Sequence, residues 1–547
     1  MSEQGKSRRP GQPGKSGRPG QSGRPERRNE QRGQDQGQGQ DRNERRNERR
    51  NEQGRTRNRG TSGGPRQYSA SAPSQRRRSA DPSRLAAFET LTAVSRDDAY
   101  ANLVLPGRIA AHRLDKRDAG FATELTYGAL RGQGFYDAVL ATCVDRPLDQ
   151  LDRPVLDALR LGAHQLLGMR VPSHAALDST VSLVRDQIGA GLSGLVNAVL
   201  RKVTAQDREA WLDQLAPVDE QTGAASDAAL AIRHSHPQWI IRALRQSLAN
   251  HGRPAEGRTA ELEALLEADN AAPVVNLVAL PGLGDLQPVL AAGAEPGPLA
   301  PGSALYRDGD AGRLPGVKEG TIRVQDVGSQ LTARALAAVP VGRAAPGAQG
   351  ASGDSHATER WLDLCAGPGG KAALMGGLAR VDGARVDAVE VSAHRAKLVE
   401  KAVRDLPVTV HVADGRDPGL EPGYDRVLVD APCSGLGALR RRPEARWRKT
   451  ESDIAELNPL QFELLTSALR LVRPGGVVVY ATCSPDLRET RAIVDKAIAE
   501  LGAEELDAHA LVPGMEDTGD HLSVQMWPHR HGTDAMFLAV LRRGLES

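Results

Sequence analysis

The sequence predicts a multidomain protein in which a disordered basic tail precedes an all-α bundle, a small α/β linking subdomain and a Rossmann-like α/β domain. Three observations support this fold class. The chain has 547 residues, which is more than one hydrophobic core usually contains. Apolar residues recur at helical spacing in 81–204, and strand-like segments alternate with helix-like segments in 336–547.

The tail, residues 1–80, is rich in Gly, Gln, Pro, Ser, Asn and Arg. It carries 21 Lys or Arg against 8 Asp or Glu, a net charge of +13, whereas the rest of the chain has a net charge of −11. Such a composition buries too little apolar surface to offset the entropy of ordering, so we expect disorder. An Arg-rich tail suits a non-specific tether for a polyanion such as RNA, and it equally suits a solubilising extension without a catalytic role.

Amphipathic segments predict that residues 81–204 form a helical bundle. In 154–169, apolar residues at three- and four-residue spacing give one apolar face. A second helix is expected from Ser173, whose side chain is predicted to cap it. A third segment, 191–203, ends in a basic pair, which suits the C-terminus of a helix.

The linking subdomain, residues 205–335, shows short apolar runs bounded by Pro and Gly. One of them, 272–280, is typical of a strand in a small mixed sheet. The stretch at 341–358 is rich in Ala, Gly and Ser, which predicts a flexible insertion in a surface loop.

The C-terminal region, residues 336–547, alternates strand and helix patterns in the manner of a parallel sheet. The expected strands are 360–365, 384–391, 408–414, 424–430, 476–483 and 535–543. Most of them end in a polar residue or a cysteine. Open α/β sheets bind ligands at these strand ends, so we expect the functional residues there.

A glycine turn and two acidic residues indicate a nucleoside cofactor. Gly367, Gly369 and Gly370 follow the first strand and allow backbone to approach a ligand at a helix N-terminus, although close strand–helix packing alone could require them. Glu390 ends the second strand and suits ribose hydroxyls, and Asp414 ends the third and can accept from an adenine amino group. Either residue alone could be a solvated strand end. Because a phosphate-binding loop is missing, S-adenosyl-L-methionine fits better than a dinucleotide.

Two cysteines, Cys433 and Cys483, lie at the ends of the fourth and fifth strands, with Asp430 close by in sequence. Carbon 5 of cytosine is a poor nucleophile until a thiolate adds to carbon 6, and a second thiol can assist release of the adduct. Asp430 is placed to hydrogen-bond the pyrimidine edge. The alternative is that both cysteines are small buried residues. The residues alone leave open which cysteine attacks.

Several motifs resemble the Sun/RsmB-type 16S rRNA (cytosine-5)-methyltransferase family. They are DLCAGPGGKA (363–372), DAPCSGLG (430–437), RRRPEARWR (440–448), YATCS (480–484) and VQDVGSQL (324–331). Upstream, FATELTYGALR (121–131), ALRLGAHQLL (158–167) and GLVNAVLRKV (194–203) are similar to the NusB-like RNA-binding domain of that family, and HSHPQWIIRAL (234–244) to its connector. The resemblance runs from about Leu85 to the C-terminus, without the insertion.

This resemblance implies a methyltransferase that uses S-adenosyl-L-methionine to modify carbon 5 of a cytosine in small-subunit rRNA. It implies that Cys483 is the nucleophile, that Cys433 assists release, and that Asp430 is catalytic. The residues implied to contact the cofactor are Cys365, Ala366, Gly367, Pro368, Gly369, Gly370, Lys371, Glu390, Asp414 and Asp430. The rival functions are a tRNA cytosine-5 methyltransferase and a non-enzymatic RNA-binding or assembly factor that retains the fold.

Five arginines follow Cys433, and we expect them on the substrate side of the cleft. They are predicted to bind phosphates and to help splay the target base, with a solvated basic face as the alternative. They are Arg440, Arg441, Arg442, Arg446 and Arg448.

The remaining features concern surroundings and partners. Four widely spaced cysteines form neither a disulfide framework nor a zinc pattern, which indicates free thiols in a reducing compartment. No segment is apolar enough to span a membrane, and the N-terminus lacks the apolar core of a signal peptide. We therefore expect a cytoplasmic protein with rRNA as partner, no membrane, no metal, and a monomeric state.

Overall fold

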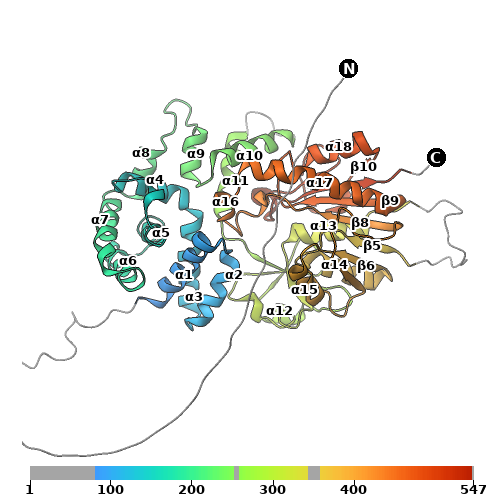
Figure 1. Ribbon diagram of the computed structural model, residues 1–547, viewed down its shortest axis with the longest axis horizontal. Helices are drawn as coiled ribbons and strands as arrows, with labels where there is room; N and C mark the ends of the chain where they lie inside the picture. The colour runs from blue at the N-terminus through green and yellow to red at the C-terminus, as the bar shows by residue number, and fades with distance from the viewer. Residues whose placement is uncertain (1–79, 252–257, 343–357, 545–547) are drawn as a thin grey trace, which may run out of the picture. The chain divides into compact units, whose positions relative to one another are not determined.

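The computed structural model describes residues 80–251, 258–342 and 358–544. Apart from Ala80, the predicted tail lies outside these residues, and so does all but the two ends of the predicted insertion. Helices dominate the described chain as far as residue 270, and two β-sheets follow (Figure 1). The multidomain fold class predicted from the sequence is confirmed for this part of the chain.

The N-terminal helices pack around one core. In the described residues they are α1 (Pro82–Asp97), α2 (Ala101–Ala111), α3 (Lys116–Arg131), α4 (Gln133–Cys143), α5 (Arg153–Leu167), α6 (Ser173–Gln187) and α7 (Ser193–Val203). The apolar faces predicted by the periodicity meet in this core, where Leu125, Leu159 and Leu183 are fully buried. Burying such a side chain stabilises the fold by about 1.5–3 kcal/mol.

Two helix ends test the local predictions. Helix α7 ends directly after the basic pair Arg201 and Lys202, as expected. Helix α6 begins at Ser173, but Pro172 is its N-cap residue and no side chain caps this end. The predicted cap by Ser173 is therefore wrong, because the serine lies one position too far into the helix for its hydroxyl to serve as the cap.

The linking region is more helical than its sequence predicted. Its helices are α8 (Arg208–Leu215), α9 (Asp227–Arg233), α10 (Gln238–Asn250), α11 (Arg258–Asn270) and the short α12 (Gln287–Ala291). Its antiparallel sheet has the order β2-β3-β1-β4, with β1 (Val275–Ala279), β2 (Glu295–Pro296), β3 (Ser303–Tyr306) and β4 (Ile322–Val324). Strand β1 lies inside the run 272–280 that predicted it.

The C-terminal sheet has the order β10-β12-β9-β8-β5-β6-β7, and β11 pairs with β12. Its strands are β5 (Arg360–Asp363), β6 (Arg385–Val389), β7 (Val408–His411), β8 (Tyr424–Asp430), β9 (Val472–Thr482), β10 (Glu504–Leu506), β11 (Val524–Gln525) and β12 (Phe537–Arg542). Strands β5 to β9 are parallel, whereas β12 is antiparallel to β9. The strand order reverses at β5, and open α/β sheets bind ligands beside such a reversal.

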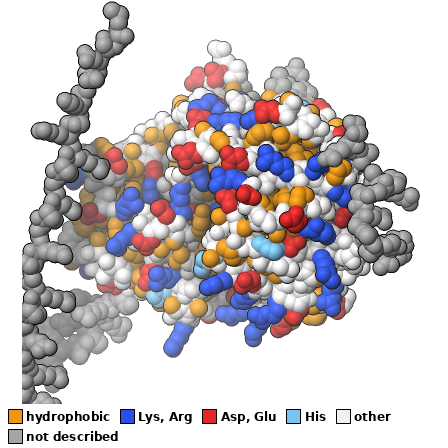
Figure 2. Space-filling view, turned by 45° about the vertical axis from the view of Figure 1, so that its right-hand side comes forward, with side chains coloured by type: hydrophobic (Ala, Val, Ile, Leu, Met, Phe, Trp, Pro, Cys, Tyr) orange, Lys and Arg blue, Asp and Glu red, His pale blue; other side chains and the backbone are white. Residues whose placement is uncertain are grey.

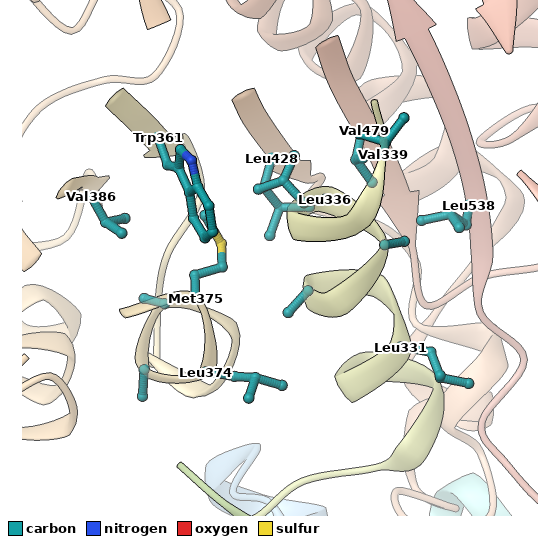
Figure 3. Packing of buried hydrophobic residues seen from close by; sticks show 14 of the residues in the cluster. Leu331, Leu336, Val339, Trp361, Leu374, Met375, Val386, Leu428, Val479 and Leu538 are labelled. Carbon is teal, nitrogen blue, oxygen red and sulfur yellow. The ribbon is translucent and has the colours of Figure 1, made fainter. Parts of the chain in front are cut away.

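Helices cover both faces of this sheet (Figure 1). One face carries α13 (Val327–Ala338), α14 (Gly370–Asp382) and α15 (Ala393–Ala402), and the other carries α17 (Glu451–Leu471) and α18 (Arg491–Leu501). Side chains alternate along the buried strands, so Leu428 packs on the α13 side and Val427 on the α17 side. Figure 3 shows the first of these cores, with Leu336 of α13 and Met375 of α14 facing the sheet.

The predicted strands lie at the expected positions in the sequence, but several of them end earlier than predicted. Strand β5 ends two residues before Cys365, and β7 ends at His411 rather than at Asp414. Glu390 and Cys483 each follow their strand directly. These four predicted site residues therefore lie in loops at one edge of the sheet, where the loop backbone sets the direction of each side chain.

Candidate active site

The glycine turn connects β5 to α14, which begins at Gly370. Gly369 has a φ of +107°, and a side chain there would run into Val399 and Ala402 of α15. This glycine is required both by the backbone and by close packing. A side chain at Gly370 would meet only the Gln325 amide, at 4.0 Å, so the turn leaves space beside the start of the helix.

Glu390 is buried and fixed by this turn. Its carboxylate accepts hydrogen bonds from the backbone N–H of Gly367 at 3.1 Å and of Ser392 at 2.9 Å, and it forms an ion pair with Arg395 at 3.4 Å. Arg395 also donates to the carbonyl oxygen of Gly367. The alternative of a solvated strand end is therefore wrong for Glu390, which holds two loops together.

Asp414 differs from Glu390 in its contacts and exposure. Its side chain is 40% exposed, and Arg416 binds it through Nε and Nη2 of the guanidinium, at 2.6 Å for the shortest pair. The hydrogen bonds from Arg416 lower the pKa of Asp414. Asp414 is thus an ionised carboxylate held by its own loop, close to the surface.

An acidic cluster lies under the turn. Asp363 is fully buried, and its Oδ2 atom has no hydrogen-bond partner among the described residues. Burial, and then the charge of Asp430, raise the pKa of Asp363 to about 7. Burial and the neighbouring carboxyls also raise the pKa of the Cys365 thiol, so that Cys365 is poorly suited to attack.

Lys371 links this cluster to the fourth strand. Its Nζ atom lies 2.8 Å from Oδ2 of Asp430. Burial opposes the charge on the lysine, but Asp430 outweighs burial and the pKa of Lys371 is raised. The ammonium group therefore stays charged beside the strand ends that carry the cysteines.

These residues fit a cationic nucleoside cofactor. Lys371 pairs with Asp430 and Arg395 pairs with Glu390, so that among the described residues no cation pairs with the buried carboxyl of Asp363. A buried polar atom without a partner is uncommon and points to a missing donor. The methionine ammonium and sulfonium groups of S-adenosyl-L-methionine carry positive charge, which suits this site.

The two cysteines meet at the neighbouring ends of β8 and β9. Their sulfur atoms are 3.4 Å apart. The hydrogen bond with Cys433 lowers the pKa of Cys483 against the effect of burial, and Lys371 adds to the lowering. The same contact, together with burial, raises the pKa of Cys433. The pair therefore favours a thiolate on Cys483 and a proton on Cys433.

Four of the five predicted phosphate-binding arginines have polar partners within the described part of the chain. Arg440 and Arg441 are both paired with Asp326 and Asp534, at N–O distances between 2.6 and 3.1 Å. These carboxylates come from the start of α13 and from the segment before β12. The two arginines thus hold the loop after Cys433 against distant parts of the chain.

The other arginines of this run reach the helical regions. Arg446 lies in the short helix α16 (Ala445–Arg448), is fully buried, and donates to the Ser235 carbonyl oxygen at 3.0 Å. Arg448 donates to carbonyl oxygens at the end of α1, including those of Val94 at 2.8 Å and Ala99 at 2.6 Å. Because Arg446 is buried and the terminal nitrogens of Arg448 donate to backbone carbonyls, we no longer expect phosphate contacts from these two residues.

Arg442 is the exception in this run. Its guanidinium lies over the ring of Tyr100, 5.0 Å from the ring centre, and Arg448 lies on the same ring at 5.4 Å.

The sequence analysis missed several residues of the site. Asp363 was visible as a carboxyl in an apolar strand, but its burial was not. Asp326 and Asp534 had no local signal, since their partners lie more than 90 positions away in sequence. Glu489 stands in the polar stretch after Cys483, where nothing in the pattern marks it as buried.

The described residues contain neither a metal-binding cluster nor a membrane-spanning helix. Within 80–251, 258–342 and 358–544, no group of three His, Cys, Asp or Glu side chains is placed to hold a metal ion. In the same ranges, no helix has both the length and the apolar character needed to cross a bilayer.

This fold and this edge of the sheet are those of methyltransferases that use S-adenosyl-L-methionine. Within that class, the chain belongs to the RsmB/F family of 16S rRNA methyltransferases, whose family model matches residues 353–542. The model of the NusB family matches residues 81–205. The predicted family, cofactor and rRNA methyltransferase class are confirmed.

Individual relatives support the assignment. A putative methyltransferase of Mycobacterium tuberculosis is 49% identical over 472 residues, which are 86% of this chain and 98% of the relative. A ribosomal RNA small subunit methyltransferase B of Erwinia tasmaniensis is 31% identical, over 84% of this chain and 98% of the relative. Among solved structures, that of PH0851 matches with a TM-score of 0.68 and 22% identity, over 85% of this chain and 99% of that one. At this identity the last match shows the shared fold alone.

Proposed function

We propose that the protein methylates carbon 5 of a cytosine in 16S rRNA through a covalent cysteine–RNA intermediate, and that it does so in the cytoplasm. The observation that carries this proposal is the pair of sulfur atoms 3.4 Å apart beside the Lys371–Asp430 ion pair. A single buried cysteine would have a structural explanation. Two thiols with opposite pKa shifts at neighbouring strand ends suit a reaction that needs both a nucleophile and a proton carrier.

Cys483 is the nucleophile in this proposal. Its thiolate adds to carbon 6 of the cytosine, and the displaced electron pair makes carbon 5 nucleophilic. When bound, S-adenosyl-L-methionine supplies the electrophilic methyl group. A water molecule then takes the carbon-5 proton, the electron pair of that C–H bond forms the carbon 5–carbon 6 double bond again, and the bond from carbon 6 to sulfur breaks with its electrons returning to Cys483 as a thiolate. Cys433 assists this release by hydrogen-bonding the departing Cys483 sulfur.

Asp430 and the cofactor residues have supporting roles in this proposal. Asp430, 28% exposed and held by Lys371, hydrogen-bonds the pyrimidine edge while charge develops on the ring. Residues 365–371 form the cofactor loop, and Glu390 and Asp414 bind the ribose and the adenine. Asp363 was not predicted to take part, and we add it as the carboxyl that faces the cationic end of the cofactor.

Small-subunit rRNA is the proposed substrate for two reasons. The Erwinia relative is a small subunit methyltransferase, and the NusB family model matches the helical region. Figure 2 shows one face of the molecule, on which basic and acidic side chains are interspersed rather than segregated. On that face, RNA affinity would come from local groups of cations rather than from a uniform field.

The test uses purified wild type, Cys483→Ala and Cys433→Ala with 16S rRNA and cofactor labelled in the methyl group. We expect Cys483→Ala to lose product and denaturant-stable adduct by about 10³-fold or more, and Cys433→Ala to accumulate the adduct. Cys143→Ala, a cysteine of α4, is the matched control and should behave as wild type.

Other outcomes would change the proposal. An adduct that persists in Cys483→Ala and disappears in Cys433→Ala would reverse the two roles. Label in tRNA but not in 16S rRNA would move the substrate to the rival class. A wild type that binds rRNA without any transfer would favour a non-enzymatic assembly factor.

A further inference from the structure

Glu489 is a buried carboxylate behind the cysteine pair. It lies between β9 and α18 and is fully buried. In the described part of the chain no Lys or Arg forms an ion pair with it. Its oxygens instead accept hydrogen bonds from the Ser434 N–H at 2.7 Å, the Ser434 hydroxyl at 2.5 Å and the Gln461 amide at 3.1 Å.

These partners flank the cysteines. Ser434 follows Cys433, and the Gln461 amide also donates to the carbonyl oxygen of Pro432, which precedes Cys433, at 2.9 Å. The Ser434 and Ser484 hydroxyls are 3.1 Å apart, and Ser484 follows Cys483. The Ser434 hydroxyl is the donor in this contact, so its single proton is shared between the Ser484 oxygen and the nearer Glu489 carboxylate.

The same loop is tied to its own strand. The Tyr480 hydroxyl, from β9, donates to the backbone carbonyl oxygen of Glu489 at 2.8 Å. The carboxylate is therefore held in place from β9 while it binds the loop after β8. It connects the two strand ends whose loops carry the two thiols.

We infer that Glu489 is a positioning residue, whose carboxylate sets the separation of Cys433 and Cys483 by holding the Ser434 and Ser484 turns together. The inference rests on the proposed function for its catalytic meaning, but the geometry it describes does not depend on catalysis. The negative charge of Glu489 also acts on Cys433. The pKa of Cys433 is raised first by its contact with Cys483 and by burial, and then by the charges of Cys483 and Glu489.

A carboxylate is needed here because every group that faces it is a donor. Glutamine at this position would keep one acceptor oxygen for the Ser434 and Gln461 N–H groups, but its amide N–H would face the Ser434 hydroxyl, which would lose the carboxylate as its acceptor. Without the negative charge the hydrogen bonds from Ser434 are weaker, and the Ser434 turn can move away from the loop that carries Glu489. Glu489→Gln therefore tests the charge and the geometry with little change in volume.

The matched control is Asp425→Asn. Asp425 also connects β8 to β9, but at the opposite ends of the strands, where it accepts from Arg473 at 2.7 Å and from the Arg360 N–H at 2.8 Å. Asp425→Asn therefore also removes a carboxylate that connects the two strands, but at the ends of the strands opposite the two thiols. Ser434→Ala is a milder second variant, which removes one link and leaves the backbone link to Glu489.

The first readout is independent of catalysis. The full chain is equilibrated with reduced and oxidised glutathione, which takes up the two electrons and two protons released when Cys433 and Cys483 form a disulfide. Mass spectrometry then gives the effective concentration of the pair. We expect a fall of about tenfold or more in Glu489→Gln, a smaller fall in Ser434→Ala, and a value within about twofold of wild type in Asp425→Asn.

The second readout divides the reaction into steps. We expect Glu489→Gln to form the RNA adduct but to release it about tenfold more slowly, as Cys433→Ala does, because the release group has moved from the nucleophile. An effective concentration that is unchanged in Glu489→Gln would overturn the inference. So would equal falls in effective concentration in Glu489→Gln and Asp425→Asn that simply follow the fall in their melting temperatures. If wild type forms no adduct while Glu489→Gln still lowers the effective concentration, the proposed function fails and the positioning role stands.

Discussion

At the scale of single residues, the site separates two thiols by their electrostatics. Cys483 and Cys433 have similar burial, yet their pKa values shift in opposite directions because each is the other's hydrogen-bond partner. The charge of Lys371 also favours a thiolate on Cys483, against the charge of Asp430. The sequence could place a thiol at each strand end, but this asymmetry depends on a distance that no pattern encodes.

Replacing Lys371 by methionine should move the pH dependence of methylation. The ammonium lowers the pKa of Cys483, so its loss raises that pKa and the rising limb of the rate profile moves to higher pH. At saturating cofactor and neutral pH we expect a rate loss of about tenfold, which higher pH restores. Lys371→Arg keeps the charge and should keep the profile; a Lys371→Met enzyme whose rate falls equally at every pH would contradict this explanation.

The buried carboxyl of Asp363 gives a second pH effect, in stability. Its folded-state pKa is raised to about 7, from a usual value of 3.8, so between these values the unfolded chain releases a proton that the folded chain keeps. The free energy of unfolding then decreases as pH rises through this window. Asp363→Asn removes the effect and should stabilise the cofactor-free protein at pH 8 by on the order of a few kcal/mol, and much less at pH 4.

Thermal unfolding of wild type and Asp363→Asn at both pH values measures this difference. Methylation by the same variant should fall, because the carboxyl that faces the cofactor is lost. Equal stabilisation at pH 4 and pH 8 would show that packing rather than ionisation is responsible.

At the scale of elements, the arginines of 440–448, which follow Cys433, have contacts that could not be predicted from the sequence. The strands, the glycine turn and the two thiols were predictable because each depends on neighbours in the chain. The contacts of Arg440, Arg441 and Arg448 were not predicted because their partners, Asp326, Asp534 and the end of α1, are distant in sequence. A basic run has the same pattern whether its donors face phosphates, carboxylates or carbonyls.

Arg448→Ala tests this reassignment. Removal of its donors leaves the carbonyls at the end of α1 without partners and should lower the free energy of unfolding by about 1–3 kcal/mol. The slope of log affinity for rRNA against log salt should stay as in wild type, because no phosphate contact is lost. Arg442→Ala loses only contact with the Tyr100 ring and should cost less than about 1 kcal/mol. A shallower salt slope in Arg448→Ala would restore the phosphate role.

At the scale of the whole molecule, charge is unevenly divided along the chain. Residues 1–80 have a net charge of +13 and the rest of the chain −11. The helical N-terminal region and the C-terminal sheet appear where periodicity predicted them. The helices of 208–270 were not foreseen, since short amphipathic segments broken by Pro and Gly resemble strands and loops.

Removing residues 1–79 should separate affinity from chemistry. We expect the dissociation constant for rRNA to rise about tenfold or more at low salt, and this difference to shrink as salt screens the charges. The turnover number at saturating RNA should not change. Filter binding across a salt series, with single-turnover methylation alongside, measures both, and equal affinities at low salt would favour the solubilising role.

The buried arginine of α16 also constrains how this protein can change over generations. Arg446 has acceptors at Ser235 and Asn270, and its neighbour Arg448 has them at the end of α1. Recombination that brought in a foreign helical region would leave a buried guanidinium facing the wrong carbonyls, at a cost comparable to the stability of a whole domain. The helical and catalytic regions should therefore be inherited as one unit, with substitutions on the two sides of this contact arising together.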